Sequence, residues 1–352
     1  MIITMRGDST NSDQQLVIRH LQERGYQTHM LSGGGDVVIG VNGRPVVDGL
    51  IDEVTDLSGV RMVNDSKKPY MLAQREARPE GTVVTVGNVR IGAGTPVIMA
   101  GPCVVESMEG MIEAAQLVKS SGATMLRGGA FKPRTSPYSF QGLGEEGLKI
   151  LALARDLTGL PVVTEVMEPE QVDLVAAYAD MLQIGSRNMS NFPLLRRAAA
   201  SGKPILLKRG FSATVEEWLM SAEYVLAGGN DKVVLCERGI RGFDTATRFT
   251  LDLNAVPLAR QLTHLPIIVD PSHGTGLRNL VEPMALAGIA AGADGLILEV
   301  HPNPDSALCD AQQSIPPSVL DRIVASTHGI ASLLTSPHTP ASIPQLAVST
   351  AA

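Results

Sequence analysis

Two parts of the chain differ in how their apolar and polar residues alternate. The first part predicts strand, helix, two strands, helix and strand, at residues 1–5, 11–24, 27–32, 36–41, 47–57 and 60–63. This order is typical of a ferredoxin-like α+β domain. A glycine run, Gly33 to Gly35, falls between the two middle strands and predicts a hairpin turn. A phosphate-binding loop is the weaker interpretation of this run, because no predicted helix follows it.

The second part consists of short apolar runs that are separated by Ala/Leu-rich stretches with helical spacing, as at residues 110–120, 144–157, 168–179 and 215–227. Eight such runs occur, at residues 96–103, 124–131, 161–166, 181–186, 204–209, 232–239, 266–273 and 295–301. Continuous apolar runs indicate strands that are buried on both faces, as in a parallel sheet. Eight βα units in about 250 residues predict a closed (β/α)8 TIM barrel, with an open doubly wound sheet as the alternative.

These patterns divide the chain into four predicted segments. Residues 1–73 form the ferredoxin-like domain, residues 74–96 a linker with a short hairpin, and residues 97–335 the barrel. The tail, residues 336–352, is rich in Pro, Ser and Ala and is expected to be disordered.

Composition narrows the class of protein. The 352 residues are 44% hydrophobic and only 3% aromatic, so the core must be built from aliphatic side chains and Met. A net charge of -7 argues against nucleic acid or an anionic membrane as the main partner. Three cysteines are too few for a disulfide framework, and neither a signal peptide nor a membrane-spanning run is found. A cytoplasmic location is the expectation.

Polar residues follow the predicted strands at one end. In a barrel this end is the face where active sites lie. The polar residues at or just beyond the strand ends are Cys103, Arg127, Glu165, Gln183, Arg187, Lys208, Arg209, Glu237, Arg238, Asp270, His273, Glu299 and His301. Taken singly, each is more typical of a solvated loop or of packing. Together, the cations of this group and Lys132 would repel one another without an anion, so we expect a phosphate or carboxylate ligand.

The segment LRGGAFKPRTSPYSF, residues 126–140, predicts a second anion site. Lys132, Pro133, Arg134, Thr135 and Ser136 offer two cations, two hydroxyl groups and backbone amides. A solvated loop is the alternative, although the neighbouring aromatic residues favour a packed one.

A metal site is the second prediction for this rim. Cys103, His273, Glu299 and Asp310 follow the first, seventh and eighth strands, which are neighbours when a barrel closes. One sulfur, one imidazole and two carboxylates suit manganese, iron, cobalt or zinc. No local metal-binding motif supports the site, so it depends on the barrel.

Seven motifs together resemble type I beta 3-deoxy-D-arabino-heptulosonate 7-phosphate (DAHP) synthases, a family with an N-terminal ferredoxin-like regulatory domain. They are AGPC (100–103), LRGGAFKPRTSPYSFQGLG (126–144), LQIGSRN (182–188), LLKRG (206–210), CERGIR (236–241), VDPSHGTG (269–276) and EVHPNPDSALCDAQQ (299–313). The resemblance implies condensation of phosphoenolpyruvate with erythrose 4-phosphate and water, the first step of the shikimate pathway.

The resemblance also assigns ligands. Phosphoenolpyruvate would be held by Arg127, Lys132, Glu165, Arg187, Lys208 and Arg238. Erythrose 4-phosphate would be held by Lys132, Pro133, Arg134, Thr135 and Ser136. One divalent ion, manganese before iron, cobalt or zinc, would be held by Cys103, His273, Glu299 and Asp310.

Catalytic roles follow from the chemistry that the resemblance implies. Lys132 is the candidate for protonating the new alkoxide, with metal-bound water as the alternative. Asp270 and Glu165 are candidates for handling the proton of the attacking water, and His273 completes the predicted catalytic set. Cys309, beside Asp310, is expected to be a bystander; oxidation with Cys103 is the alternative.

The resemblance further implies a tyrosine or phenylalanine effector that binds the N-terminal domain, and a homotetramer, with a dimer as the alternative. The rival enzyme is 3-deoxy-D-manno-octulosonate 8-phosphate synthase, for which we expect a KANRSS-like loop in place of KPRTS. A rival from another class is an amino-acid sensor whose barrel no longer catalyses.

Overall fold

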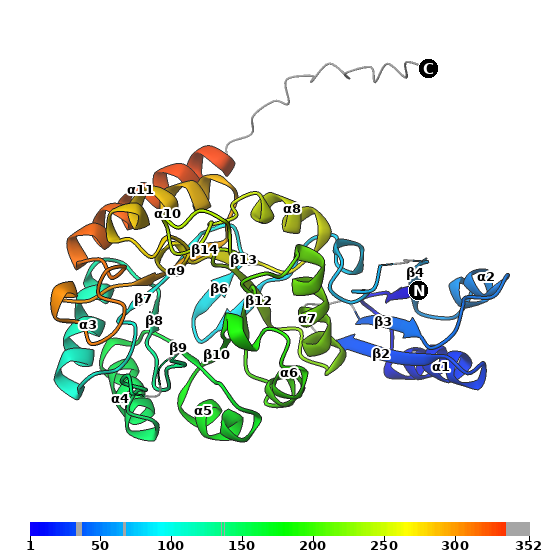
Figure 1. Cartoon of the computed structure of the whole chain (residues 1–352). Coiled ribbons are helices and arrows are strands. Elements are labelled where there is room, and N and C mark those ends of the chain that lie inside the picture. Colours follow the sequence, from blue (N-terminus) through cyan, green and yellow to red (C-terminus); the bar gives the residue numbers. More distant parts are fainter. Residues whose placement is uncertain (33–36, 66–67, 135, 137, 336–352) are drawn as a thin grey trace, which may run out of the picture.

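The computed structural model describes residues 1–32, 37–65, 68–134, 136 and 138–335. It consists of a small N-terminal domain beside a larger barrel (Figure 1). The glycine turn at residues 33–35 and the tail from residue 336 lie outside the described residues. Within the described residues, no helix combines the length and apolarity that are needed to cross a membrane.

The N-terminal domain is an antiparallel sheet with the strand order β2-β3-β1-β4. Its strands are β1 (Ile2–Met5), β2 (Gln27–Ser32), β3 (Val37–Asn42) and β4 (Val60–Asn64), and its helices are α1 (Asn11–Glu23) and α2 (Leu50–Thr55). Thr10 and Asp13 form a capping box that fixes the start of α1. The predicted ferredoxin-like fold is confirmed.

Eight parallel strands form a closed barrel in which neighbours in sequence are neighbours in space. They are β7 (Val97–Gly101), β8 (Met125–Arg127), β9 (Val162–Glu165), β10 (Met181–Ile184), β11 (Ile205–Lys208), β12 (Val233–Glu237), β13 (Ile267–Val269) and β14 (Gly295–Glu299). The ring closes where β14 pairs with β7, from Gly295 opposite Val97 to Glu299 opposite Gly101. The predicted TIM barrel is confirmed, and the open sheet is not found.

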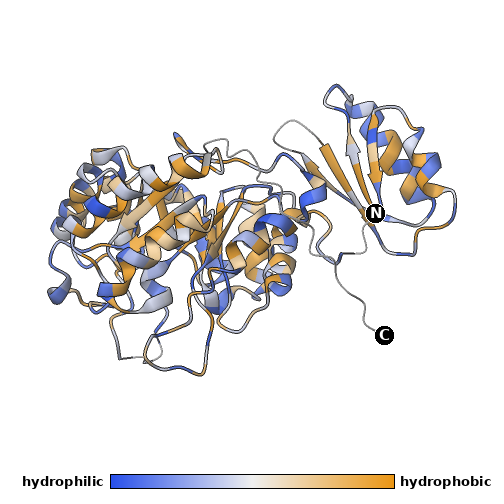
Figure 2. Cartoon of the chain, turned by 90° about the horizontal axis from the view of Figure 1, so that it is seen from above, coloured by the Kyte–Doolittle hydropathy of each residue, from blue (hydrophilic) through white to orange (hydrophobic). Residues whose placement is uncertain are grey.

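Helices surround the ring of strands (Figure 1). They are α3 (Met108–Ser120), α4 (Glu145–Thr158), α5 (Val172–Tyr178), α6 (Phe192–Ala200), α7 (Val215–Ala227), α8 (Ala255–Leu262), α9 (Pro271–Thr275), α10 (Arg278–Ala290) and α11 (Pro317–Thr335). Short 3-10 turns lie at Arg75–Ala77, Pro169–Gln171, Ser186–Asn188 and Pro304–Ser306. Hydrophobic residues, orange in Figure 2, are frequent in the strands and in the helices around them, and their buried members form one large core cluster. Trp218 of α7 is fully buried there, and its indole Nε1 donates to the Leu207 carbonyl at 3.1 Å.

A two-stranded hairpin closes the end of the barrel at which the strands begin. Its strands are β5 (Val84–Val86) and β6 (Val89–Ile91), and β6 lies at the centre of the ring in Figure 1. The four valine and isoleucine side chains of the hairpin pack in one cluster with inward-facing strand residues such as Met99 and Met125. The hairpin therefore covers one end of the barrel interior.

The segment between the two domains is held by polar groups of the barrel. Glu223 of α7 accepts hydrogen bonds from the backbone N–H groups of Leu72 and Ala73, at 2.9 and 2.8 Å. His264 Nε2 lies 2.7 Å from the Leu72 carbonyl, and its Nδ1 lies 2.7 Å from the Thr82 hydroxyl. The N-terminal sheet thus approaches α7 through a fixed connection.

Candidate active site

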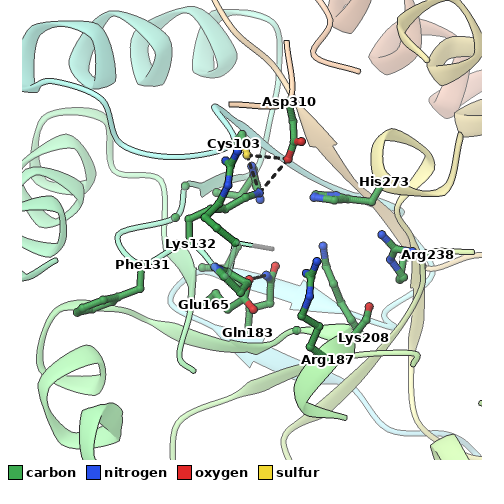
Figure 3. Close-up of a pocket in the computed structure, with 18 of the residues that line it drawn as sticks. Cys103, Phe131, Lys132, Glu165, Gln183, Arg187, Lys208, Arg238, His273 and Asp310 are labelled. Carbon is green, nitrogen blue, oxygen red and sulfur yellow. Dashed lines mark hydrogen bonds and ion pairs between the residues drawn. The ribbon is translucent and has the colours of Figure 1, made fainter. Parts of the chain in front are cut away.

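The C-terminal ends of the strands surround a cavity of about 270 Å³. Twelve residues of the predicted site line it: Cys103, Arg127, Lys132, Pro133, Arg134, Ser136, Glu165, Arg187, Lys208, Arg238, His273 and Asp310. Figure 3 shows the labelled members of this set pointing toward one another from strand ends and from the loops, turn and helix that follow the strands. Thr135 lies outside the described residues, and Glu299 and Asp270 lie behind the cavity wall.

One side of the cavity is cationic. Lys208 is the last residue of β11, and Arg238 is the first residue after β12. Arg187 lies in the turn after β10 (Figure 3). Lys208 is paired with Asp270, whose Oδ2 is 2.6 Å from Nζ. Among the residues that the structure describes, neither Arg187 nor Arg238 has a carboxylate within 4.0 Å. Burial lowers the pKa of Arg238 to about 10, so this side of the cavity favours an anion.

The opposite side carries the predicted metal ligands. His273 Nε2 lies 3.2 Å from Glu299 Oε1, and the Cys103 thiol lies 3.3 Å from Asp310 Oδ2. His273, Glu299 and Asp310 place one donor atom each within 4.8 Å of one another, and Cys103 and Asp310 form a second such group with Cys309. Asp310 therefore joins the two groups. A thiol, an imidazole and two carboxylates fit a divalent ion of intermediate softness.

Two further contacts orient these ligands. Asp270 Oδ2 accepts from His273 Nδ1 at 2.8 Å, which leaves Nε2 directed at Glu299. Gln313 donates from Nε2 to Glu299 Oε2 at 2.6 Å. Such outer contacts typically fix metal-ligating side chains. Burial lowers the pKa of His273 to about 4, so its imidazole is neutral at pH 7 and able to bind a metal.

Asp310 has an unusual backbone conformation. With φ of 51°, it is the one non-glycine residue in the left-handed region among the described residues. Such backbone strain is often found at functional sites. Here it accompanies a carboxylate that both donor groups share.

Lys132 contacts two of the predicted metal ligands. Its Nζ lies 2.7 Å from Cys103 Sγ and 3.0 Å from Asp310 Oδ2. Burial disfavours its charge, but the facing Cys103, Glu299 and Asp310 overcome this effect and raise the pKa of Lys132. The ammonium group is therefore protonated at pH 7.

Asp270 does not reach the cavity. It is 1% exposed and is held by Lys208 and His273. Burial opposes its charge, but His273 and Lys208 hold its pKa well below the usual range. This placement favours orientation of its two partners over the exchange of a proton with water. Glu165 does line the cavity, and its Oε2 accepts from Gln183 at 3.0 Å.

Cys309 is not remote from the site. Its Sγ accepts a hydrogen bond from Arg134 Nη1 and lies within 4.8 Å of Cys103 Sγ. The bystander interpretation therefore does not describe its position. The Cys309 sulfur instead lies between the loop that carries Arg134 and the predicted metal ligands.

Some polar residues at the strand ends have structural partners. Arg209 binds Glu237 Oε2 at 2.9 Å and Asp252 Oδ2 at 2.8 Å, and none of the three lines the cavity. His301 lies 3.8 Å from Glu106. Sequence reasoning missed four residues around the site: Phe211, Arg248, Phe249 and Gln313. All four lie in loops without a periodic apolar pattern. The signal that could have identified Phe211 and Phe249 is an aromatic residue shortly after an arginine, in Arg209-Gly210-Phe211 and in Arg248-Phe249.

Both parts of the chain match models of known protein families. A model of the DAHP synthetase I family matches residues 71–334, and a model of the DAHP synthase ferredoxin-like domain matches residues 1–65. Phospho-2-dehydro-3-deoxyheptonate aldolase of Thermotoga maritima is 48% identical over 336 residues, which cover 95% of this chain and 98% of that protein. A 2-dehydro-3-deoxyphosphooctonate aldolase of Desulfatibacillum aliphaticivorans is 35% identical over 259 residues, or 67% of this chain and 93% of that protein.

Solved structures agree with this assignment. The crystal structure of the Thermotoga maritima phospho-2-dehydro-3-deoxyheptonate aldolase (DAHP synthase) matches with a TM-score of 0.75 at 47% identity, over 95% of this chain and 97% of that chain. A truncated form of the Thermotoga maritima synthase matches with a TM-score of 0.71 at 49% identity, over 75% of this chain and 97% of that chain.

Proposed function

The chain belongs to the DAHP synthetase I family, and we propose that it condenses phosphoenolpyruvate with D-erythrose 4-phosphate and water to DAHP and inorganic phosphate. This transferase reaction opens the shikimate pathway to the aromatic amino acids. The observation that carries the proposal is that one cavity has a cationic side and a side of metal ligands, with the Lys132 ammonium group against two of those ligands. Two anionic substrates that must react with each other require such a division.

Phosphoenolpyruvate binds on the cationic side in this proposal. Arg187, Lys208 and Arg238 face the cavity there, and Arg127 and Lys132 approach from the other side. Bidentate contacts from the arginines suit the phosphate and carboxylate groups of this substrate. Glu165 lies at the same wall, where it can accept the proton of the water that attacks C2 of phosphoenolpyruvate.

Erythrose 4-phosphate binds at the loop that contains Lys132, Pro133, Arg134, Thr135 and Ser136. The described members of this loop line the cavity. Its phosphate would be held by Arg134 and the loop hydroxyl groups, and its aldehyde would point toward the metal ligands. Lys132 is positioned between the substrates and is the proposed donor of the proton to the alkoxide that forms when the two carbons join.

Cys103, His273, Glu299 and Asp310 would hold one divalent ion, with manganese as the first candidate and iron, cobalt and zinc as alternatives. A bound ion of this kind polarises the aldehyde as a Lewis acid. Asp270 keeps His273 in the tautomer that presents Nε2. It also holds Lys208 in place, so that one buried carboxylate orients both sides of the site.

The alternative is synthesis of 3-deoxy-D-manno-octulosonate 8-phosphate. The octonate relative is less identical and covers 67% of the chain, whereas the heptonate relative covers 95% of it. The ferredoxin-like domain supports tyrosine or phenylalanine as an effector. We also propose a homotetramer, with a dimer as the alternative.

A phosphate-release assay tests the proposal. The protein is incubated with phosphoenolpyruvate and either erythrose 4-phosphate or arabinose 5-phosphate, before and after chelation, and with manganese added back. We expect phosphate release with erythrose 4-phosphate, its loss on chelation and its recovery with manganese. A preference for arabinose 5-phosphate would support the octonate alternative. Binding of tyrosine or phenylalanine without turnover would support the sensor alternative.

A further inference from the structure

Arg238 differs from the other buried cations of the site. It is 3% exposed, and its hydrogen bond to the Gly239 carbonyl, at 3.4 Å, is the one that it makes within the described part of the chain. Arg127, Lys208 and Arg209 each have a carboxylate partner. A buried guanidinium without such a partner is unfavourable unless another group stabilises its charge.

Two phenylalanine rings provide this stabilisation. The guanidinium carbon of Arg238 lies 4.1 Å from the ring centroid of Phe249 and 4.9 Å from that of Phe211. The two rings stack on each other, with centroids 5.0 Å apart and an interplanar angle of 10°. The negative face of an aromatic ring attracts a cation, most strongly where water is excluded.

Three more arginines lie near the same two rings. Arg187 and Arg241 each lie 5.5 Å from the Phe211 centroid, and Arg248 lies 5.7 Å from the Phe249 centroid. Arg187, Arg238 and Arg248 line the cavity together with Phe211, whereas Phe249 lies behind them. Four guanidinium groups therefore surround one stacked pair, in a chain that has only six phenylalanines.

Backbone contacts hold both rings in place. Ile240 and Thr250 exchange two hydrogen bonds of 2.9 Å, which closes the loop after β12 around Phe249. Arg241 N donates to the Phe211 carbonyl at 2.7 Å and ties this loop to the loop after β11. Gly239 has a φ of +90°, and a Cβ atom there would lie 2.8 Å from Phe249 Cβ. The loop is thus built for close approach of Phe249 to the end of β12.

An aromatic pair offers an advantage that a carboxylate does not. A carboxylate beside Arg238 would accept its N–H groups and compete with an incoming anion. A ring face stabilises the cation but occupies none of its in-plane donors. We propose that the Phe211–Phe249 pair is a positioning element that keeps Arg238 and Arg187 free to bind phosphoenolpyruvate and so sets the affinity for this substrate. The inference rests on the proposed function.

The test is a comparison of Phe249→Leu with Phe249→Tyr. Leu keeps most of the apolar volume but removes the ring, whereas Tyr restores it. We expect Phe249→Leu to raise the KM for phosphoenolpyruvate about tenfold, the size expected for loss of a desolvated cation–π contact. The KM for erythrose 4-phosphate and kcat should stay within about twofold, and Phe249→Tyr should be close to the wild type. Calorimetric binding of phosphoenolpyruvate alone should weaken by the same factor.

Two control variants separate this role from general packing. Phe192→Leu removes a second stacked pair, Phe192 with Tyr224 at 4.2 Å between α6 and α7. Phe243→Leu changes a fully exposed ring of the same loop as Phe249. Both should leave the KM for phosphoenolpyruvate unchanged. If Phe249→Leu does not fold, Phe211→Leu makes the same test.

Three results would overturn the inference. They are an unchanged KM for phosphoenolpyruvate in Phe249→Leu, a parallel rise in both KM values, and a failure of Phe249→Tyr to restore binding. A wild type that binds phosphoenolpyruvate but forms no DAHP would contradict the proposed function alone, because the calorimetric comparison would still decide the role of the rings. A wild type that binds no phosphoenolpyruvate would overturn both.

Discussion

Lys132 is the cation that lies against the predicted metal ligands, because its ammonium group contacts both Cys103 and Asp310. Replacing Lys132 with Met keeps the length of the side chain and removes its charge and proton. We expect kcat to fall at least a hundredfold, as for loss of a general acid, while the metal content per chain stays near that of the wild type. Turnover and elemental analysis of the same preparation check this. Substantial remaining turnover would contradict the acid role.

Cys309 and Cys103 form a second testable pair, since their sulfur atoms lie within 4.8 Å of each other. Hydrogen peroxide converts one thiol to a sulfenic acid with release of water, and the other thiol then displaces a second water to form a disulfide. We expect treated, metal-free protein to contain a Cys103–Cys309 crosslink by peptide mass spectrometry. Cys309→Ser should lack the crosslink, and Cys236, which is buried in the barrel core, should stay reduced in both. Absence of the crosslink from the wild type would refute the pairing.

How far the site could be predicted depends on where each residue lies. Cys103, Arg127 and Lys208 end apolar runs or follow them directly, so the barrel hypothesis alone brings them to one rim. Phe249 and Gln313 lie far beyond the ends of β12 and β14, where no periodic pattern constrains the chain. Their positions depend on loop closure, as in the Ile240–Thr250 pairing, which is a tertiary contact that local sequence does not encode.

At the scale of elements, the strands were the most predictable part of the fold, because apolar runs that are buried on both faces have few other uses. Helix boundaries were less predictable. The helix expected over residues 47–57 is shorter and begins at Leu50, since Gly49 adopts a φ of 82°. The helix expected over residues 168–179 begins with a 3-10 turn at Pro169 and becomes α-helical at Val172. In both cases one residue with special backbone geometry, Gly49 or Pro169, determines how the helix begins.

The end of β7 depends on one glycine. Gly101 has a φ of +154°, and a Cβ atom there would lie 2.1 Å from the Arg127 carbonyl oxygen on β8. We expect Gly101→Ala to lower the free energy of unfolding by about 3 kcal/mol, because the two strands must separate, and to displace Cys103 and Arg127.

A matched variant isolates the clash. Gly94→Ala has a similarly unfavourable φ of +93°, but within the described residues no atom lies within 4 Å of the added Cβ. It should cost about 1 kcal/mol and leave activity unchanged. Urea unfolding of both variants makes the comparison, and equal destabilisation would show that backbone conformation alone matters at Gly101.

At the scale of the whole molecule, two titratable groups of the barrel hold the connection between the domains, the half-buried Glu223 and the buried His264, and their pKa values shift in opposite directions. Burial raises the pKa of Glu223 to about 7 from its usual value of 4.5, despite the bonds from Leu72 and Ala73. The contribution of Glu223 to stability is therefore present below about pH 4.5 and lost as the pH rises through 7. Burial lowers the pKa of His264 from 6.5 to about 4, so its contribution is present above pH 6.5 and lost as the pH falls through 4.

Glu223→Gln separates these effects. The amide does not titrate, so the free energy of unfolding of the wild type relative to the variant should fall by about 2 kcal/mol between pH 5 and pH 8. The effect of His264 cancels in this difference, since both proteins retain it. Unfolding curves at four pH values in that interval provide the measurement. A difference that does not change with pH would contradict a raised pKa at Glu223.

The hairpin β5–β6 seals the ring although it precedes all eight strands of the ring in the chain. A shortened protein that starts after Ile91 would lack the hairpin and expose the strand side chains that the hairpin covers to water. A shortened protein that starts between Tyr70 and Val84 would keep the hairpin. The boundary between the ferredoxin-like domain and the barrel therefore lies before the hairpin, and the segment that carries Leu72 and Ala73 belongs to the barrel side of that boundary, because Glu223 and His264 hold it there.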